Sequence, residues 1–180
     1  MLDIESLIKN WVYLTKTDDI VSKDYYCQTR DVFQARLSHL LAETQYHLLV
    51  ASVGEIGNNS FDHNLGKWLD IPGVIFGHNN QEKIIVIADR GQGIRKTLSR
   101  VVPSINDDQT AIKIALTEIV SGRAPEQRGN GLKFVLNNVI KNGWDFYLQS
   151  GNGLAEVENG KVDLKTTAEI ANGCLSIIKY

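Results

Sequence analysis

Apolar residues recur at helical spacing near the start of the chain. Ile4, Leu7, Ile8 and Trp11 follow a period of three to four residues, which predicts a short amphipathic helix over residues 4–14. The apolar face of this helix either covers the protein's own core or forms a contact with a second copy or another partner. Periodicity does not separate these alternatives, so a homodimer stays open at this point.

Helical and strand-like patterns alternate between residues 29 and 122. Residues 29–63 show the helical period twice and predict two helices, the second of which ends at Gly66. Two apolar runs on either side of a turn-like segment predict a hairpin, and a pair of good N-cap residues predicts a further helix. The strands of the hairpin are predicted at 73–76 and 84–88, with the turn at 78–80. The further helix is predicted to start near Asn106 or Asp107 and to stop at Gly122.

The last third of the chain begins with its clearest helical stripe and continues as strands. The stripe consists of Leu132, Val135, Leu136, Val139 and Ile140, and Gly143 closes it. Strands are predicted at 144–149, 154–157 and 174–178, with turn-like segments at 150–153 and 158–160. The whole pattern predicts an α+β fold, a two-layer α/β sandwich with three or more helices on one face of a mixed, mostly antiparallel sheet.

Composition narrows the class of protein. With 180 residues, of which 43% are apolar, the chain fits one domain with a sizeable core. The net charge is -2 and both signs are mixed along the chain, which argues against a nucleic-acid partner. Cys27 and Cys174 lack metal-ligand spacing, and the sequence has neither a basic leader nor an apolar run that would cross a bilayer. We therefore expect a soluble cytoplasmic protein without a membrane partner.

A first polar cluster interrupts the second predicted helix. Glu55, Asn59, Asp62 and His63 fall at i, i+4, i+7 and i+8, so they lie along one stripe of that helix. An amide oxygen one turn from a carboxylate suits an octahedral Mg²⁺ that keeps several waters. A solvated helix face is the alternative, although Gly57 in mid-helix costs about 1 kcal/mol relative to alanine and calls for a packing or ligand explanation.

A second cluster follows the buried strand at 84–88. The strand leads directly into Asp89, and Gly91 and Gly93 in the next loop let the backbone approach a flat ligand closely. The aspartate can accept a hydrogen bond from an exocyclic amine. A simple Asp-X-Gly turn at the end of a strand would show the same pattern.

A third cluster precedes the strongest helix. Gly129 and Gly131 soften the chain where this helix begins, so that free backbone amides at its N-terminus point toward one spot and can bind an anion. Arg123 and Arg128 nearby are able to add contacts to phosphate. The alternative is a helix-entry turn with solvated arginines.

Taken together and in this order, the three clusters resemble the GHKL superfamily of ATPases, which includes gyrase, heat-shock chaperones, histidine kinases and mismatch-repair proteins. The resemblance covers roughly residues 32–180. Residues 48–63 look like the asparagine-box helix of the family, residues 89–93 like its first glycine box and residues 129–132 like its second. It implies a Bergerat-type ATP-binding domain over 29–180 that is preceded by a helical extension over 1–28, with ATP and Mg²⁺ as cofactors.

The resemblance also implies roles for single residues. Asn59 would ligate Mg²⁺, and Glu55 would be the catalytic residue that orients or deprotonates the attacking nucleophile. Asp89 would accept a hydrogen bond from the adenine amino group, with Gly93 under the base, and glycine amides of the second box would bind the phosphates. The remaining residues implied to contact the nucleotide are Asp62, His63, Gly91, Ile94, Arg128, Gly129, Asn130, Gly131, Leu132 and Ser176.

Some features depart from the family pattern. Family members place a threonine or serine near the adenine on a late strand, and either Ser176 or Cys174 fills that position here. His39 lacks the signature of a phosphoacceptor histidine, because Leu40 and the residues after it are apolar. We expect no second domain that would send a lysine to the terminal phosphate, which disfavours a two-domain clamp. The lid over the phosphates is expected within 95–128.

In type, the chain is most similar to the anti-sigma-factor serine/threonine kinases. That similarity implies that Glu55 takes a proton from the hydroxyl of a partner protein of the anti-sigma-factor-antagonist type. Two alternatives remain open from the sequence. One is a nucleotide-gated protein-binding module with slow or no turnover, and the other is a stand-alone histidine-kinase catalytic domain that acts on another chain.

Overall fold

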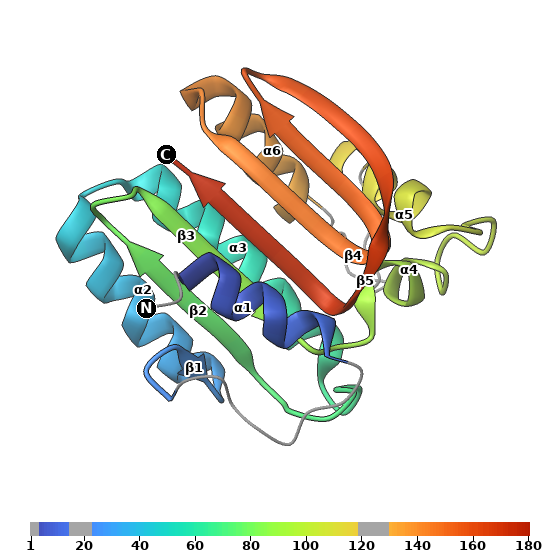
Figure 1. The fold of residues 1–180 in the computed structure, drawn as a ribbon, viewed down its shortest axis with the longest axis horizontal. Helices are drawn as coiled ribbons and strands as arrows, with labels where there is room; N and C mark the ends of the chain where they lie inside the picture. Colours follow the sequence, from blue (N-terminus) through green and yellow to red (C-terminus); the bar gives the residue numbers. More distant parts are fainter. Residues whose placement is uncertain (1–3, 15–22, 119–129) are drawn as a thin grey trace.

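The computed structural model describes residues 4–14, 23–118 and 130–180. None of the helices within these ranges has the length and apolar character needed to span a bilayer. Figure 1 shows the arrangement of the elements. In chain order they are α1 (Ile4–Tyr13), β1 (Tyr26–Cys27), α2 (Arg30–Thr44), α3 (His47–Asn64), β2 (Val74–Asn79), β3 (Ile84–Asp89), α4 (Gly93–Leu98), α5 (Asp108–Thr117), α6 (Gly131–Asn142), β4 (Asp145–Glu158) and β5 (Lys161–Lys179).

The strands form one antiparallel sheet in the order β1-β2-β3-β5-β4. The last strand, β5, therefore lies between β3 and β4, and its C-terminal half pairs with the whole of β3. In this register Asp89 is opposite Cys174, and Ile87 is opposite Ser176. Residues from the middle and the end of the chain thus meet on neighbouring strands.

Most helices cover one face of the sheet, as predicted. The larger core lies between this face and α2, α3, α5 and α6, with fully buried side chains such as Phe33, Val53, Ile112 and Val135. The α+β architecture expected from the sequence is therefore confirmed, with a sheet that is antiparallel throughout.

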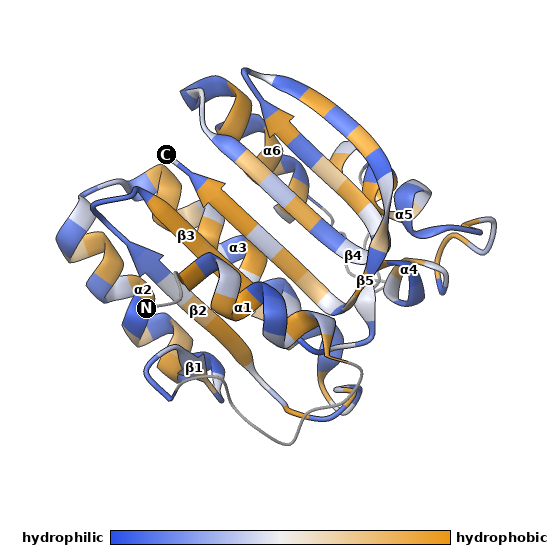
Figure 2. Cartoon of the chain, viewed as in Figure 1, coloured by the Kyte–Doolittle hydropathy of each residue, from blue (hydrophilic) through white to orange (hydrophobic). Residues whose placement is uncertain are grey.

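Helix α1 lies on the opposite face of the sheet, which the prediction of helices on one face did not include. Ile8, Trp11 and Val12 are buried there and pack with apolar side chains of the three central strands. Figure 1 shows α1 in front of the sheet with α2 and α3 behind it, and Figure 2 shows the hydrophobic stretches of β3 and β5 that run beneath it. The apolar face of α1 therefore covers the protein's own core.

Gly57 has a packing explanation. A Cβ atom at this position would lie 2.1 Å from the Phe33 ring, so α2 and α3 approach each other through the missing side chain. The ring itself is held in an edge-on contact with Phe76, with centroids 5.6 Å apart. A glycine in mid-helix is tolerated here because the close approach of the two helices offsets its poor helix propensity.

Several predicted boundaries are confirmed. Thr29 caps α2, since its side chain accepts a hydrogen bond from the Val32 amide, and Asp107 caps α5 in the same way through Thr110. Gly143 closes α6 in the left-handed conformation, with φ 68°. Helix α3 ends at Asn64, slightly before the predicted stop at Gly66, and α5 ends at Thr117, before Gly122.

The turn predicted at 150–153 is wrong. Strand β4 continues through this segment with a bulge, where its register against β5 shifts between Ser150 and Gly153. The Asp108 carboxylate lies where a Cβ atom at Gly151 would be, and its Oδ2 accepts a hydrogen bond from the Asn152 amide at 3.1 Å. The glycines therefore admit the start of α5 instead of reversing the chain.

Other boundaries differ in detail, and one predicted turn is confirmed. The hairpin turn comes later than predicted, because β2 continues to Asn79. The turn at 158–160 is confirmed, with Asn159 and Gly160 at positive φ. The short elements β1 and α4 were not predicted, since neither is long enough to show a period.

Candidate functional site

A cavity of about 710 Å³ lies where the second half of α3, the end of β3 and the starts of α4 and α6 meet. Gly91 is not on its wall, and Arg128 and Gly129 lie outside the described residues, as does Arg123. The predicted site residues that do line it are Glu55, Asn59, Asp62, His63, Asp89, Gly93, Ile94, Asn130, Gly131, Leu132 and Ser176.

The floor of the cavity is formed by Asp89, which β3 delivers with only 1% of its surface exposed. Its carboxylate accepts hydrogen bonds from the Ser60 hydroxyl at 2.7 Å, the Gly91 amide at 2.8 Å and the Asn64 side chain at 3.2 Å. Burial raises the pKa of Asp89, and these bonds and the Cys174 amide lower it. The carboxylate also lines the cavity, so a donor that enters the cavity can approach it.

Gly91 supports this floor from outside the cavity. A Cβ atom at Gly91 would lie 2.0 Å from the Asn64 side chain, so the absence of a side chain lets Asn64 reach Asp89. Asn64 also accepts a hydrogen bond from the Gln92 amide at 3.0 Å. The first glycine of this loop therefore makes room for a buried amide.

The roles of Ser60 and Asn64 were not predicted from the sequence. Both are buried, and both continue the apolar stripe of α3 formed by Leu49, Val53 and Ile56. Polar residues at apolar-face positions were the available signal, because a buried hydroxyl or amide needs a partner. Here that partner is the Asp89 carboxylate.

On β5, Ser176 carries a hydroxyl that stands out in the cavity wall. Ser176 is 2% exposed, and its hydroxyl makes no hydrogen bond with another described residue. The neighbouring Cys174 thiol donates to Ser150 Oγ at 3.6 Å, and burial raises its pKa well above the ordinary value. A buried unpaired hydroxyl costs free energy that a ligand atom can recover, so Ser176 is better suited than Cys174 to meet a polar ligand.

Glu55 and Asn59 lie against the first residue of α6. A Cβ atom at Gly131 would be 2.6 Å from Glu55 Oε2 and 3.3 Å from Asn59 Nδ2. The N-cap residue Asn130 makes no side-chain capping bond within the described chain, so the first-turn amides of α6 are open to an anion. An acid, an amide and a helix N-terminus therefore meet at one end of the cavity.

Asp62 and His63 are at the rim and are engaged with neighbouring segments. Asp62 forms an ion pair with Arg30, whose guanidinium lies over the Phe61 ring, 5.8 Å from its centroid. The His63 carbonyl accepts a hydrogen bond from the Gln92 side chain at 2.7 Å. Arg30 also lines the cavity and was not singled out in the sequence. It brings a cation to the rim.

Glu55 and Asn59 of α3 fit a magnesium ion that takes most of its coordinating oxygens from a bound phosphate compound and water. Within the described residues, no three His, Cys, Asp or Glu side chains gather to hold a metal by themselves. Mg²⁺ usually takes one or two protein oxygens and completes its octahedron with phosphates and water. Asn59 and Glu55, one helical turn apart beside the α6 N-terminus, match that donor set.

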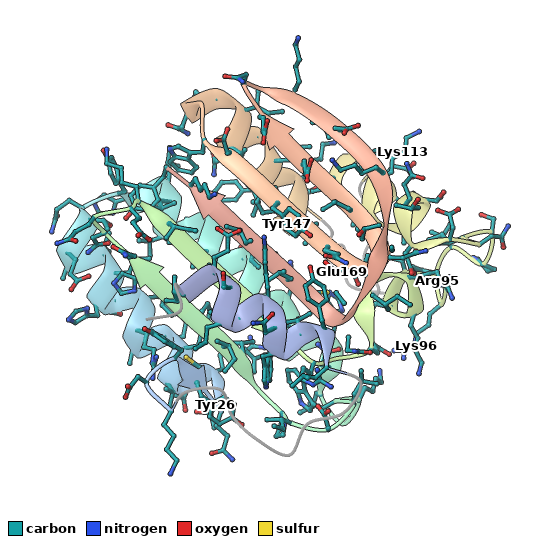
Figure 3. The ribbon with its side chains drawn as sticks, in the orientation of Figure 1. Tyr26, Arg95, Lys96, Lys113, Tyr147 and Glu169 are labelled. Atoms are coloured by element: carbon teal, nitrogen blue, oxygen red, sulfur yellow. The ribbon has the colours of Figure 1, made fainter. Side chains whose placement is uncertain are left out.

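The segment expected to contain the lid starts at α4. Gly93 has φ +80°, and the next amide, that of Ile94, donates to the buried Ser150 hydroxyl at 2.9 Å. Arg95, Lys96 and Lys113 are exposed on α4 and α5, as Figure 3 shows. Residues 119–129 lie outside the described ranges, so only the first part of the expected lid is placed.

No protein-family model matches the chain, and no curated protein matches it. Among solved structures 38 chains match. One is the ATP-binding domain of topoisomerase IV from Francisella tularensis in complex with a small-molecule inhibitor, with a TM-score of 0.43 and 18% identity over 71% of this chain and 61% of that chain. A match of this size does not place the chain in a family.

Proposed function

We propose that this protein binds an adenine nucleotide together with Mg²⁺ in the cavity. The observation that carries the proposal is the meeting of three distant segments on the walls of one cavity. They are represented by Glu55 and Asn59 of α3, Asp89 at the end of β3, and Gly131 at the start of α6. The volume of about 710 Å³ is in the ordinary range for small-molecule sites.

The polar groups of the cavity determine the orientation of the bound nucleotide. At the floor, Asp89 accepts a hydrogen bond from the exocyclic amine of the base, and the unpaired Ser176 hydroxyl finds a partner on the same ring. At the other end, the open amides of the first turn of α6 receive the phosphates. This order of groups is the one that the resemblance to GHKL ATPases implies.

Asn59 is the residue of this chain that would hold the magnesium ion, and Glu55 lies beside it. When bound, the ion neutralises phosphate charge and so favours phosphoryl transfer. The arrangement of these two side chains against Gly131 brings them to the phosphate end of the cavity.

We further propose that the nucleotide is ATP and that its terminal phosphoryl group passes to a serine or threonine hydroxyl of a partner protein. The exposed carboxylate of Glu55 supports this, because a site that only binds nucleotide has little use for an acid beside the phosphates. Glu55 takes the hydroxyl proton, the hydroxyl oxygen bonds to the γ-phosphorus, and ADP leaves. A partner of the anti-sigma-factor-antagonist type is what the resemblance implies.

The test is transfer of label from γ-labelled ATP with Mg²⁺ to candidate partner proteins. We expect acid-stable label on the partner, which is the property of phosphoserine and phosphothreonine, and no label with Glu55→Ala. Acid-labile label would instead identify a histidine kinase. ATP binding without label or hydrolysis would leave only a nucleotide-gated binding module.

A further inference from the structure

Arg90 is a fully buried arginine with all of its partners inside the protein. Its guanidinium makes a bidentate ion pair with Asp70, with Nε 2.9 Å from Oδ1 and Nη2 2.8 Å from Oδ2. Nη1 donates to the carbonyl oxygens of Trp11 at 2.8 Å and Val12 at 3.5 Å. The guanidinium also lies over the Trp11 ring, 5.6 Å from its centroid. One side chain thus joins the end of β3, the loop after α3 and the end of α1.

A second side chain holds the same end of α1. The Asn172 amide donates to the carbonyl oxygens of Leu14 at 2.8 Å and Val12 at 3.4 Å. The last carbonyls of a helix have no partner within it, and this end carries partial negative charge that favours a cation. Arg90 and Asn172 therefore form a C-terminal clamp for α1, and we use that name for this pair.

Both members of the clamp adjoin the strand pair that carries the base site. Arg90 follows Asp89, and Asn172 precedes Gly173 and Cys174, which is paired with Asp89. Gly173 is in close contact with this partner strand, because a Cβ atom there would lie 2.1 Å from the Asp89 carbonyl oxygen. A displacement of either clamp residue therefore moves the backbone that positions Asp89.

Asp89 and Arg90 point to opposite faces of the sheet. Successive side chains of an extended chain alternate between faces. Asp89 faces the cavity on the side of α3, where it meets Ser60, and Arg90 faces α1 on the other side, where it meets Trp11. The two faces are thus linked through a single peptide unit.

We infer that Arg90 is a positioning residue that couples docking of α1 on one face of the sheet to nucleotide binding on the other. The inference rests on the proposed function. With α1 docked, the clamp holds the loop after β3 and the part of β5 before Cys174 in the geometry that presents Asp89 to the base. By linkage, a nucleotide that prefers this geometry must strengthen α1 docking by the same factor.

The rest of α1 supplies a matched control. Lys9 pairs with Glu5 at 2.6 Å and lies over the Tyr147 ring at 5.2 Å, so its contacts are with α1 itself and with β4. Tyr147 is labelled in Figure 3 and is far in sequence from the clamp. Lys9→Ala weakens contacts of the helix without touching Arg90 or Asn172.

The first experiment is amide hydrogen exchange of the full chain with and without a non-hydrolysable ATP analogue and Mg²⁺. We expect the nucleotide to slow exchange in α1 as well as around the cavity, although α1 is on the far face of the sheet. A purely structural role of Arg90 gives α1 the same exchange rates in both states, and that result overturns the inference.

The second experiment measures nucleotide affinity by calorimetry for Asn172→Ala, Arg90→Lys and the control Lys9→Ala. We expect Asn172→Ala to lose affinity at least about fivefold and to exchange faster in α1, with Lys9→Ala at parental affinity. Arg90→Lys should lose more, because lysine cannot make the bidentate pair. If Arg90→Lys does not fold, Asn172→Ala carries the test. Faster α1 exchange in Asn172→Ala at parental affinity overturns the coupling, whereas a parent that binds no nucleotide overturns the proposed function and the inference with it.

Discussion

The Ser60 hydroxyl donates a hydrogen bond to Asp89 Oδ2 at 2.7 Å, and both side chains are buried. This bond joins the last turns of α3 to the end of β3 beneath the cavity. It fixes the direction of the carboxylate before any ligand arrives, so the acceptor that we propose for the base is preorganised. The same bond links the cluster that carries Glu55 and Asn59 to the cluster that carries Asp89.

Removal of this hydroxyl should weaken nucleotide binding without unfolding the protein. Ser60→Ala frees the carboxylate to reorient, so we expect nucleotide affinity to fall roughly fivefold. Ser52→Ala is the matched control, since Ser52 is also buried on α3 but is bonded to Leu48 and Asn138. Calorimetry should show weaker binding only for Ser60→Ala. Equal losses in both variants would mean that the effect is general destabilisation.

The free energy of unfolding should depend on pH because the pKa of the buried Asp89 is raised. Burial is the larger influence and raises the pKa of Asp89 above the value of about 3.9 for an unfolded chain. The folded protein then binds more protons than the unfolded chain between these two pKa values, so this group's contribution to stability falls as pH rises through that window.

Asp89→Asn does not titrate, so its free energy of unfolding relative to the parent should rise with pH across the same window. Urea unfolding of both proteins at a series of pH values measures the difference. A difference that stays constant with pH would show that Asp89 is not held at a raised pKa.

Alanine substitution of Glu55 or Gly131 should lower turnover more than nucleotide affinity. Glu55→Ala should keep nucleotide affinity and lose about 10²- to 10⁴-fold in phosphoryl transfer, the usual contribution of a general base. Gly131→Ala places a Cβ atom 2.6 Å from Glu55 Oε2, and the exposed glutamate must move away from the start of α6.

Both variants should therefore share a low kcat in steady-state assays while their thermal stability stays near that of the parent. Parental turnover in Glu55→Ala would show that Glu55 is not the general base. Parental turnover in Gly131→Ala alone would show that the position of Glu55 against α6 does not matter.

Two glycines of α3 should respond to alanine with opposite signs. At Gly54 a Cβ atom makes an ordinary contact, 3.4 Å from Leu37 Cδ1, and alanine should stabilise the helix by up to about 1 kcal/mol. At Gly57 the new atom meets the Phe33 ring, and overpacking of this kind costs about 1–3 kcal/mol. Chemical denaturation of the two variants checks the pair. A stabilised Gly57→Ala would show that α2 and α3 do not pack as closely as described.

The elements that could be predicted from the sequence are those with enough length to show a period or with clear caps. Helices α2, α3, α5 and α6 meet these conditions, and so does α1. The face of the sheet that α1 covers could not be predicted, because an amphipathic stripe fits either face of a sheet with two apolar sides. The bulge at Gly151 was read as a turn, since the glycines that admit Asp108 also favour reversal of the chain.

Site residues could be predicted from the sequence where they interrupt an apolar pattern. They could not be predicted where their role depends on a partner from a distant part of the chain. Glu55, Asn59 and Asp89 stand out in sequence because they interrupt apolar patterns, and the structure brings them to one cavity. Arg90 and Arg30 do not stand out, because an arginine in a loop or at a helix start is ordinary until its partners are known. Their roles depend on segments far away in the chain.

Nucleotide binding is tested most directly by titration of the protein with a non-hydrolysable ATP analogue and Mg²⁺ by calorimetry, alongside Asp89→Asn and the corresponding guanine nucleotide. We predict one site that prefers adenine over guanine, and a loss of about tenfold or more in Asp89→Asn, because a hydrogen bond to a charged acceptor contributes about 1.5–3 kcal/mol. No uptake of the adenine nucleotide by the parent, or equal affinity in Asp89→Asn, would contradict this prediction.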